Sequence, residues 1–281
     1  ALPMITPHQK KIAGEISSFA LKTIIGILFI SPLIVGVCFS LQTDQELMTY
    51  PLKLITANPT LESYAQVFRQ IPILHYLKNS AVVCLVCIVA QVIISCLAAY
   101  GFVFFKFPGK NLLFTLILMT TMIPGEVVVI TNYVTIQNMD LIDTYIGLVL
   151  PSLISGTAIF LMRQYFMTLP KDYKEAAILD GCGDMGFLFR VAMPLSIPTI
   201  SSLAIYLFVQ IYNQYFWPML VTSRDEMRTI QIGISYLVTA DVVNYGHILA
   251  GAVVAIIPSV LIYILGQDYI IKGMTAGGLK G

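Results

Sequence analysis

The stretch LPKDYKEAAILDGCGDMGFLFRVAMPLSIP, Leu169 to Pro198, is a polar interruption between two long apolar segments. Pro170 suits the first turn of a helix, where its missing N–H is not needed. Glu175 follows early in that helix, where a carboxylate favours the positive end of the helix dipole. Gly181 stands where the helix would end in a left-handed turn, a conformation that glycine adopts cheaply. The pattern therefore predicts a short helix, a tight turn and a second helix that Asp184 can cap.

Composition places the rest of the chain in a membrane. Of 281 residues, 57% are apolar and only 11% are charged, and the mean hydropathy is +0.83. Average globular proteins carry about 25% charged residues. The net charge of +1 gives no indication of a nucleic-acid partner. No GxxxxGK[ST] stretch occurs, so we expect any ATP to be handled by another chain and no cofactor to be bound by this one.

The apolar segments predict an all-α polytopic protein with six transmembrane helices. We expect a polar N-terminus over 1–22, a membrane domain over 23–266 that includes the loop 169–197, and a tail over 267–281. Pro124, Gly125 and Glu126 should break the third span, and the connection from Gln42 to Asn79 should contain short interfacial helices at YPLKLI and NPTLESYAQVF. The predicted spans are Thr23–Leu41, Ser80–Phe105, Leu112–Val134, Tyr145–Met162, Pro198–Leu220 and Ile248–Leu265.

The distribution of Lys and Arg predicts the orientation. With the N-terminus inside, eleven of the sixteen basic residues fall on the cytoplasmic side. Among the short loops, KFPGK is then inside and the base-free NMDLID is outside. Both termini and the EAAILDG stretch are therefore expected in the cytoplasm.

The polar stretch resembles the cytoplasmic coupling loop of binding-protein-dependent ABC importer permeases. The run from Arg163 to Pro194 carries the LP, EAA, DG and MPL elements of that pattern in order. The ending DYIIKGMTAGGLKG, from Asp268, and the segment NQYFWP resemble the maltose-type, carbohydrate-importing branch. Cys182 and Gly183 depart from the pattern, since relatives more often carry Ala and a small hydroxyl residue there.

The resemblance implies a type I importer permease in a bacterial cytoplasmic membrane. Such a subunit forms half of a pathway for a sugar or related solute, beside a second homologous permease. Its other partners are two nucleotide-binding ATPase subunits, which use ATP and Mg, an extracytoplasmic solute-binding protein and the lipid bilayer. The loop Val221–Tyr245 should contact the binding protein. The residues implied in coupling are Glu175, Ala176, Ala177, Asp180 and Gly181, with a second contact at Lys272 and Gly273.

Polar residues inside the spans are candidates for the substrate pathway. Glu126 is the only carboxylate well inside a predicted span, where ionisable groups are costly and often functional. A structural or gating role for Glu126 is an alternative. Asn213, Gln214 and Tyr215 lie late in the fifth span, where amides can bond sugar hydroxyls and aromatic rings can cover sugar faces. Interfacial anchoring and interhelical hydrogen bonding are the alternatives for these three.

Two other functions fit the sequence less well than the permease does. A self-powered carrier or channel usually needs a relay of ionisable groups or an internal repeat, and neither is visible. Gly181 to Asp184 reads as GxGD, the signature of intramembrane aspartyl proteases, but every other Asp falls in a predicted loop or tail. Cys84 and Cys87 form a CxxC in apolar sequence, for which packing is the simpler interpretation.

Overall fold

The computed structural model describes residues 7–238 and 244–276, with side chains described over 15–238 and 244–269. In these ranges the chain forms helices and loops only. The elements are α1 (Pro7–Ser40), α2 (Asp44–Leu47), α3 (Glu62–Gln70), α4 (Ile73–Phe104), α5 (Lys110–Thr120), α6 (Gly125–Asn138), α7 (Tyr145–Val149), η1 (Leu150–Ser152), α8 (Gly156–Phe166), α9 (Asp172–Leu179), α10 (Asp184–Phe187), the π-helical η2 (Leu188–Ala192), α11 (Met193–Leu195), α12 (Ile197–Tyr212), α13 (Phe216–Val221), η3 (Asp225–Met227), α14 (Ile230–Ser235) and α15 (Tyr245–Ala276).

The chain divides into two compact units, Ala1–Ile71 with Leu237–Val254 and Pro72–Tyr236 with Ala255–Gly281. In the first unit, NPTLESYAQVF contains α3, as predicted. The prediction of a helix at YPLKLI is wrong, because residues 50–55 form no helix and the side chain of Gln42 bonds the carbonyl of Lys53 at 2.7 Å instead. The second unit contains the pathway candidates and the loop 169–197, which we call the coupling loop after the role that the resemblance implies.

Among the described residues, three helices and three bent helix pairs are long and apolar enough to cross a membrane. The helices are the Glu15–Ser40 part of α1, all of α4, and the Tyr245–Tyr269 part of α15. The bends are 93° between α5 and α6, 51° between the α7–η1 segment and α8, and 78° between Asp184–Leu195 and α12. The number of apolar spans is six, as predicted, when each bent pair counts as one span, but the pair that ends with α12 begins at Asp184, inside the loop 169–197. The third span is broken at Pro124 as expected.

The fourth and fifth spans differ from the continuous helices that were predicted. In the fourth, Pro151 lies in η1 and a new helix begins only at Gly156. In the fifth, α12 ends at Tyr212 and α13 follows after a short gap. Pro218 explains the second break, because its ring excludes the helical carbonyl four residues earlier, at Gln214. The predicted irregular loop after this span also contains α14, whose Ile230 and Ile232 are buried.

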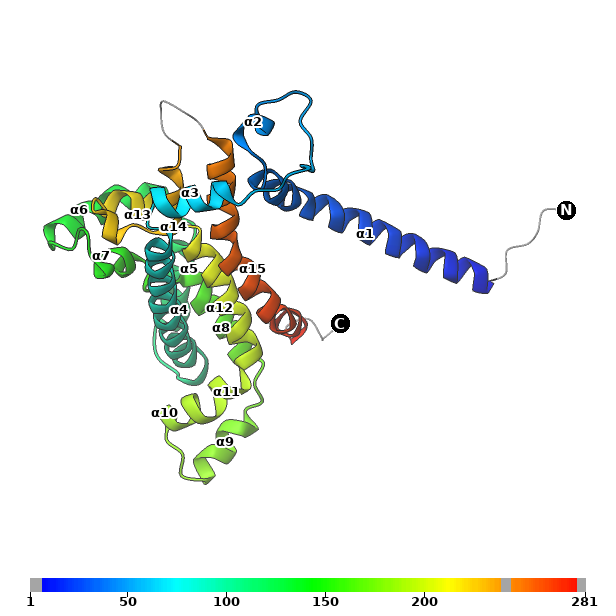
Figure 1. The fold of residues 1–281 in the computed structure, drawn as a ribbon. Helices are drawn as coiled ribbons and strands as arrows, with labels where there is room; N and C mark the ends of the chain where they lie inside the picture. Colours follow the sequence, from blue (N-terminus) through cyan, green and yellow to red (C-terminus); the bar gives the residue numbers. More distant parts are fainter. Residues whose placement is uncertain (1–6, 239–243, 277–281) are drawn as a thin grey trace. The chain divides into compact units, whose positions relative to one another are not determined.

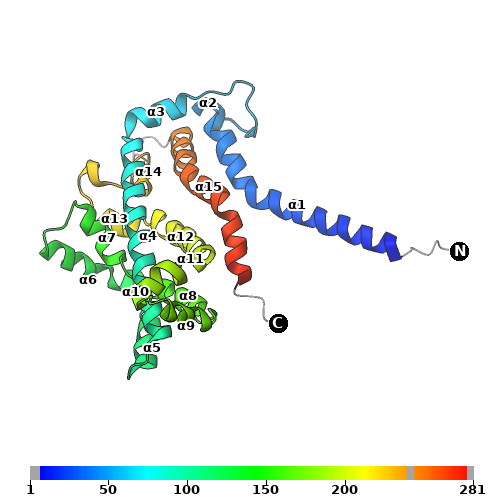
Figure 2. The ribbon, with the colours of Figure 1, turned by 90° about the horizontal axis from the view of Figure 1, so that it is seen from below.

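In the second unit α4 packs along α8 and α12, as Figures 1 and 2 both show. Small and thiol side chains, such as Cys96, Ala99 and Ala158, are fully buried there and allow close helix approach. Cys84 and Cys87 are buried in the same helix as free thiols. Figure 1 places α9 beyond one end of α4, whereas α13 and α14 lie near its other end.

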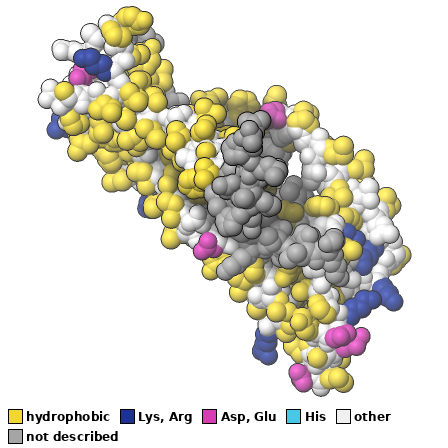
Figure 3. Space-filling view, turned by 90° about the vertical axis from the view of Figure 1, so that its right-hand side faces the viewer, with side chains coloured by type: hydrophobic (Ala, Val, Ile, Leu, Met, Phe, Trp, Pro, Cys, Tyr) yellow, Lys and Arg dark blue, Asp and Glu magenta, His cyan; other side chains and the backbone are white. Residues whose placement is uncertain are grey.

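Much of the apolar surface is uncovered. Large apolar side chains on α5 and α6 are about half exposed or more: Leu112, Leu116, Val127 and Ile130. Figure 3 shows hydrophobic side chains spread over much of the visible face, with charged side chains in small groups. Soluble monomers rarely expose apolar patches on this scale, so the surface fits a lipid environment.

Candidate functional site

The coupling loop begins with α9, eight residues that make about two turns. Gly181 has φ +75°, the left-handed conformation that the sequence predicts. Its N–H bonds the carbonyl of Ile178 at 2.9 Å, and the N–H of Cys182 bonds that of Ala177 at 2.8 Å. These two bonds are the Schellman motif, which satisfies the last carbonyls of a helix. The end of α9 is therefore a defined turn rather than a loose loop.

A long-range polar contact fixes this turn to α4. The carboxylate of Asp184 lies 3.1 Å from the ammonium of Lys174 and accepts a 2.8 Å hydrogen bond from the hydroxyl of Tyr100. The bond from Tyr100 and then the interaction with Lys174 hold the pKa of Asp184 below its usual value. The prediction that Asp184 caps α10 is wrong, since Gly183 occupies the cap position and no side chain caps it. Asp184 bonds Tyr100 instead.

Aromatic rings join the loop to the end of α4. The buried ring of Phe187 lies 5.4 Å from that of Phe104 and 6.1 Å from that of Tyr100. The ammonium of Lys174 lies 5.2 Å from the ring centres of Phe104 and Phe105, within the range of cation–π attraction. Figure 2 shows α10 beside the end of α4. A displacement of α9 is therefore resisted by packing as well as by charge.

The outward side of α9 carries most of the predicted coupling residues. Glu175, Ala176, Asp180 and Gly181 are exposed. Ala177 is only 8% exposed, so of the two alanines implied in coupling only Ala176 is open to a partner. The sequence analysis did not single out Ile178 and Leu179, which are 60% and 88% exposed. An apolar side chain exposed to this degree at the end of a helix is the signal that points to them.

The two tail residues lie inside α15. Lys272 and Gly273 are helical rather than part of an irregular tail. Their side-chain surroundings, and residues 277–281, lie outside the part that the structure describes. About two turns earlier in the chain, α15 packs on α12, since a Cβ placed on Gly266 would stand 2.2 Å from the Cδ1 of Ile205.

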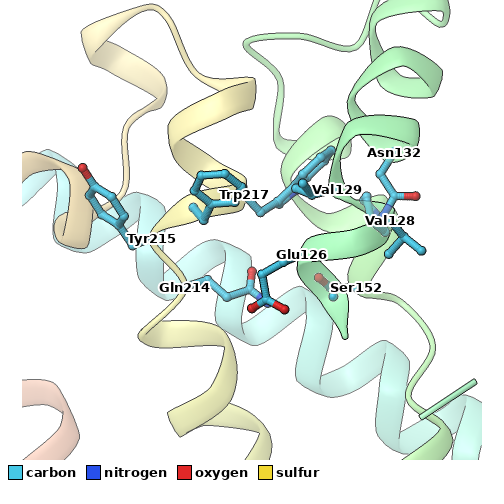
Figure 4. A pocket seen from close by; sticks show the side chains of 11 residues that line it. Glu126, Val128, Val129, Asn132, Ser152, Gln214, Tyr215 and Trp217 are labelled. Atoms are coloured by element: carbon cyan, nitrogen blue, oxygen red, sulfur yellow. The ribbon is translucent and has the colours of Figure 1, made fainter. Parts of the chain in front are cut away.

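A cavity of about 400 Å³ lies where three spans are interrupted. Its walls come from the start of α6, from η1, and from the break between α12 and α13 (Figure 4). Pockets for small molecules commonly measure about 300–1,000 Å³. Backbone that is not helical at membrane depth is tolerated where it lines such a cavity. The lining residues are Gly125, Glu126, Val128, Val129, Asn132, Pro151, Ser152, Gln214, Tyr215, Phe216 and Trp217.

The structure brings three of the four pathway candidates together. Glu126, in the first turn of α6, and Gln214 and Tyr215, at the break, all line the cavity. Figure 4 shows the polar ends of Glu126 and Gln214 in its lower part, near Ser152. Asn213 is not among the lining residues, because its amide donates to the carbonyl of Val209 at 2.9 Å and accepts from Gln231 at 3.3 Å.

Further polar residues at the cavity were not predicted. Asn132 and Ser152 line it, and Gln91, buried in α4, donates to the carbonyl of Ser152. This bond satisfies a carbonyl that the break at η1 frees from helical bonding. A Gln in the apolar run AVVCLVCIVAQVII of α4 is the signal for this role. Within the described ranges no three His, Cys, Asp or Glu side chains are grouped so that they could hold a metal ion.

Comparisons with known proteins agree on one family. Residues 91–276 match the family described as "binding-protein-dependent transport system inner membrane component". The chain is 32% identical over 260 residues to the arabinooligosaccharides transport system permease protein AraQ of Halalkalibacterium halodurans, covering 92% of this chain and 93% of that protein. It is 34% identical over 277 residues to the sn-glycerol-3-phosphate transport system permease protein UgpE of Brucella suis biovar 1, covering 95% and 98%.

A solved structure has the same fold. It is the crystal structure of a bacterial ABC transporter involved in the import of the acidic polysaccharide alginate. The TM-score is 0.82 at 20% identity, covering 95% of this chain and 99% of that chain. At this identity the likeness supports the fold and nothing about the solute.

Proposed function

Because the chain belongs to the family of binding-protein-dependent transport system inner membrane components, we propose that it forms half of the pathway by which a sugar or related polar solute enters a bacterial cell. A second homologous permease subunit supplies the other half. An extracytoplasmic solute-binding protein delivers the solute, and two ATPase subunits drive transport. ATP and Mg²⁺ are used by those subunits, and this chain binds neither.

The geometry of the coupling loop carries this proposal. Energy coupling needs a rigid element that an ATPase subunit can hold, so that closure of the ATPase pair moves the spans. The helix α9 meets this need, since the turn at Gly181 and the contacts of Asp184 and Phe187 fix it to α4. The outward Glu175, Ala176 and Leu179 then form the surface that enters the ATPase subunit.

The class of solute is proposed from relatives and from the pocket. AraQ is named for arabinooligosaccharides and UgpE for sn-glycerol-3-phosphate, both rich in hydroxyl groups. The pocket combines amide and carboxylate groups at Gln214 and Glu126 with the rings of Tyr215 and Trp217. Amides donate hydrogen bonds to hydroxyls and accept them, carboxylates accept them, and flat apolar rings cover the faces of sugars.

Reconstituted vesicles test the function and the orientation. With all subunits assembled and the binding protein outside, solute uptake should require ATP in the lumen. Uptake that persists without ATP, or without the ATPase subunits, would instead support a self-powered carrier or channel. In the same right-side-out vesicles, a thiol reagent that does not cross membranes should label a Ser223→Cys variant and not a Glu175→Cys variant. The reverse pattern would reject the proposed topology, in which both termini are cytoplasmic.

We expect Gln214→Ala to raise the solute concentration for half-maximal uptake about ten-fold, as loss of one or two neutral hydrogen bonds would. Asn213→Ala is the matched control, because its amide bonds within the chain and does not line the pocket. Uptake kinetics at saturating binding protein measure both variants. Equal effects of the two substitutions would show that the pocket does not contact the solute.

A further inference from the structure

The end of the second unit opposite the coupling loop carries a charged turn, Ser223–Arg228, which we name the outer turn. The side chains of Arg224 and Asp225 are 73% and 66% exposed. The backbone of the turn, in contrast, is held by several side chains from other elements. The outer turn therefore presents charges outward on a backbone of defined conformation.

Asn79, near the start of α4, is fully buried beneath this turn. Its amide nitrogen donates to the carbonyls of Glu226 and Arg228, both at 2.8 Å. One turn of α4 earlier, the Nε2 of His75 donates to the carbonyl of Glu226 at 2.7 Å. The Oγ of Ser80 accepts from the N–H of Ile230 at 2.9 Å. The outer turn is thus bonded to α4 at several points.

The remaining bond of Asn79 leads away from the turn. Its Oδ1 accepts a 2.6 Å hydrogen bond from the hydroxyl of Tyr145, the first residue of α7. Just before α7, the carboxylate of Asp143 accepts from the N–H groups of Ser223 at 2.6 Å and Arg224 at 2.9 Å. Both ends of the outer turn are therefore tied to the segment that begins α7.

The other end of that segment lies at the pocket. The α7–η1 segment runs from Tyr145 to Ser152, and its last residues line the cavity. Midway, the carbonyl of Leu148 accepts a 3.1 Å hydrogen bond from the indole of Trp217, which also lines the cavity. One short helical segment thus begins at Tyr145, which is linked to the outer turn through Asn79, and ends at the pocket (Figure 4 shows its pocket end).

We propose that Asn79 is a positioning residue that transmits docking at the outer turn to the pocket through Tyr145 and the α7–η1 segment. The proposal rests on the proposed function for the identity of the docking partner, the solute-binding protein. Docking that shifts the outer turn moves Asn79 and its bond to Tyr145. The shift then reaches Trp217 and Ser152, so the pocket changes when the partner arrives. Contiguous contacts do not by themselves prove coupling. Two tests therefore distinguish transmission through Tyr145 from a role of Tyr145 in stabilising the fold alone.

The first test uses the full chain alone. Trp217 is the only tryptophan, so its fluorescence reports on the pocket end of the segment. Tyr145→Phe deletes the hydroxyl that joins α7 to Asn79 and leaves the outer turn bonded to α4. We expect its Trp217 emission to shift to longer wavelength and to be quenched more strongly by acrylamide. Tyr212→Phe is the control, because it deletes a hydroxyl bond of the same kind, to the carbonyl of Ala255 at 2.7 Å, outside the link.

The second test uses the assembled transporter with its loaded solute-binding protein. Tyr145→Phe should lower the maximal stimulation of ATP hydrolysis about five-fold, the equivalent of one hydrogen bond. The half-saturating concentration of binding protein and the unstimulated rate should stay unchanged, because the turn itself is intact. Asn79→Ala should alter both the maximal stimulation and the half-saturating concentration, because it also frees the turn.

The outcomes distinguish this link from the proposed function. If the wild-type complex is not stimulated by the binding protein, the proposed function fails and the inference fails with it. If the wild type responds and Tyr145→Phe matches it in fluorescence and stimulation, the link alone is rejected. If Tyr145→Phe and Tyr212→Phe lower thermal stability and the unstimulated rate alike, Tyr145 serves only the fold, which also overturns the proposal.

Discussion

Uptake should fall at least about ten-fold when Gly181 is replaced by Val, although the protein still inserts into the membrane. Gly181 has φ +75° and no atom lies within 4 Å of the position that a Cβ would take. The penalty is therefore backbone strain, on the order of 1–3 kcal/mol, rather than a clash. Relief of that strain needs another turn, which breaks the bonds to Ile178 and Ala177 and misplaces the outward side of α9.

Gly181→Asn is the matched control, because Asn also adds a branched side chain and adopts the left-handed conformation at helix ends. Uptake by the two variants, at equal amounts in the membrane, makes the comparison. Transport should persist in Gly181→Asn and fail in Gly181→Val, with ATP hydrolysis uncoupled from uptake. If both variants lose uptake equally, a side chain at this position blocks the partner. If both keep wild-type uptake, the left-handed turn is not needed for coupling.

The local features of the coupling loop could be predicted from sequence, but its long-range contacts could not. A glycine about three turns after Pro170 determines the left-handed end of α9 by backbone sterics alone. The hydrogen-bond partner of Asp184 could not be predicted in this way, because Tyr100 is 84 residues away along the chain. Helix-capping rules consider only neighbours in sequence, so they assigned Asp184 to the N–H groups of α10. A three-dimensional contact overrode that local preference.

The pocket, too, could be predicted from the sequence only in part. Pro124 followed by glycine predicts the break before α6, but Pro151 and Pro218 are compatible with either a kink or a full interruption. Packing decides between these, as at Gly156, where a Cβ would stand 2.6 Å from the Cγ2 of Thr121. Adjacent residues such as Asn213 and Gln214 also point in different directions, which composition does not reveal. Three of four pathway candidates therefore met at one cavity and the fourth did not.

The ATPase subunit should be lost from the purified complex when Leu179 is replaced by Asp. Leu179 is 88% exposed beside Ile178 at the outward end of α9, and a partner that covers them removes this apolar surface from water. A carboxylate at the same place would have to lose its water without a partner charge, at a cost of several kcal/mol. A loss of about 3 kcal/mol weakens binding more than about 100-fold.

Leu179→Met keeps the apolar volume and should keep both the complex and its transport activity. Copurification of the ATPase subunit with each variant, at matched levels in the membrane, measures the effect. Because position 179 is exposed in this chain, neither change should disturb insertion or the contact between Lys174 and Asp184. A Leu179→Asp complex that retains its ATPase subunits and transports at the wild-type rate would show that the ATPase subunit binds elsewhere than at the outward side of α9.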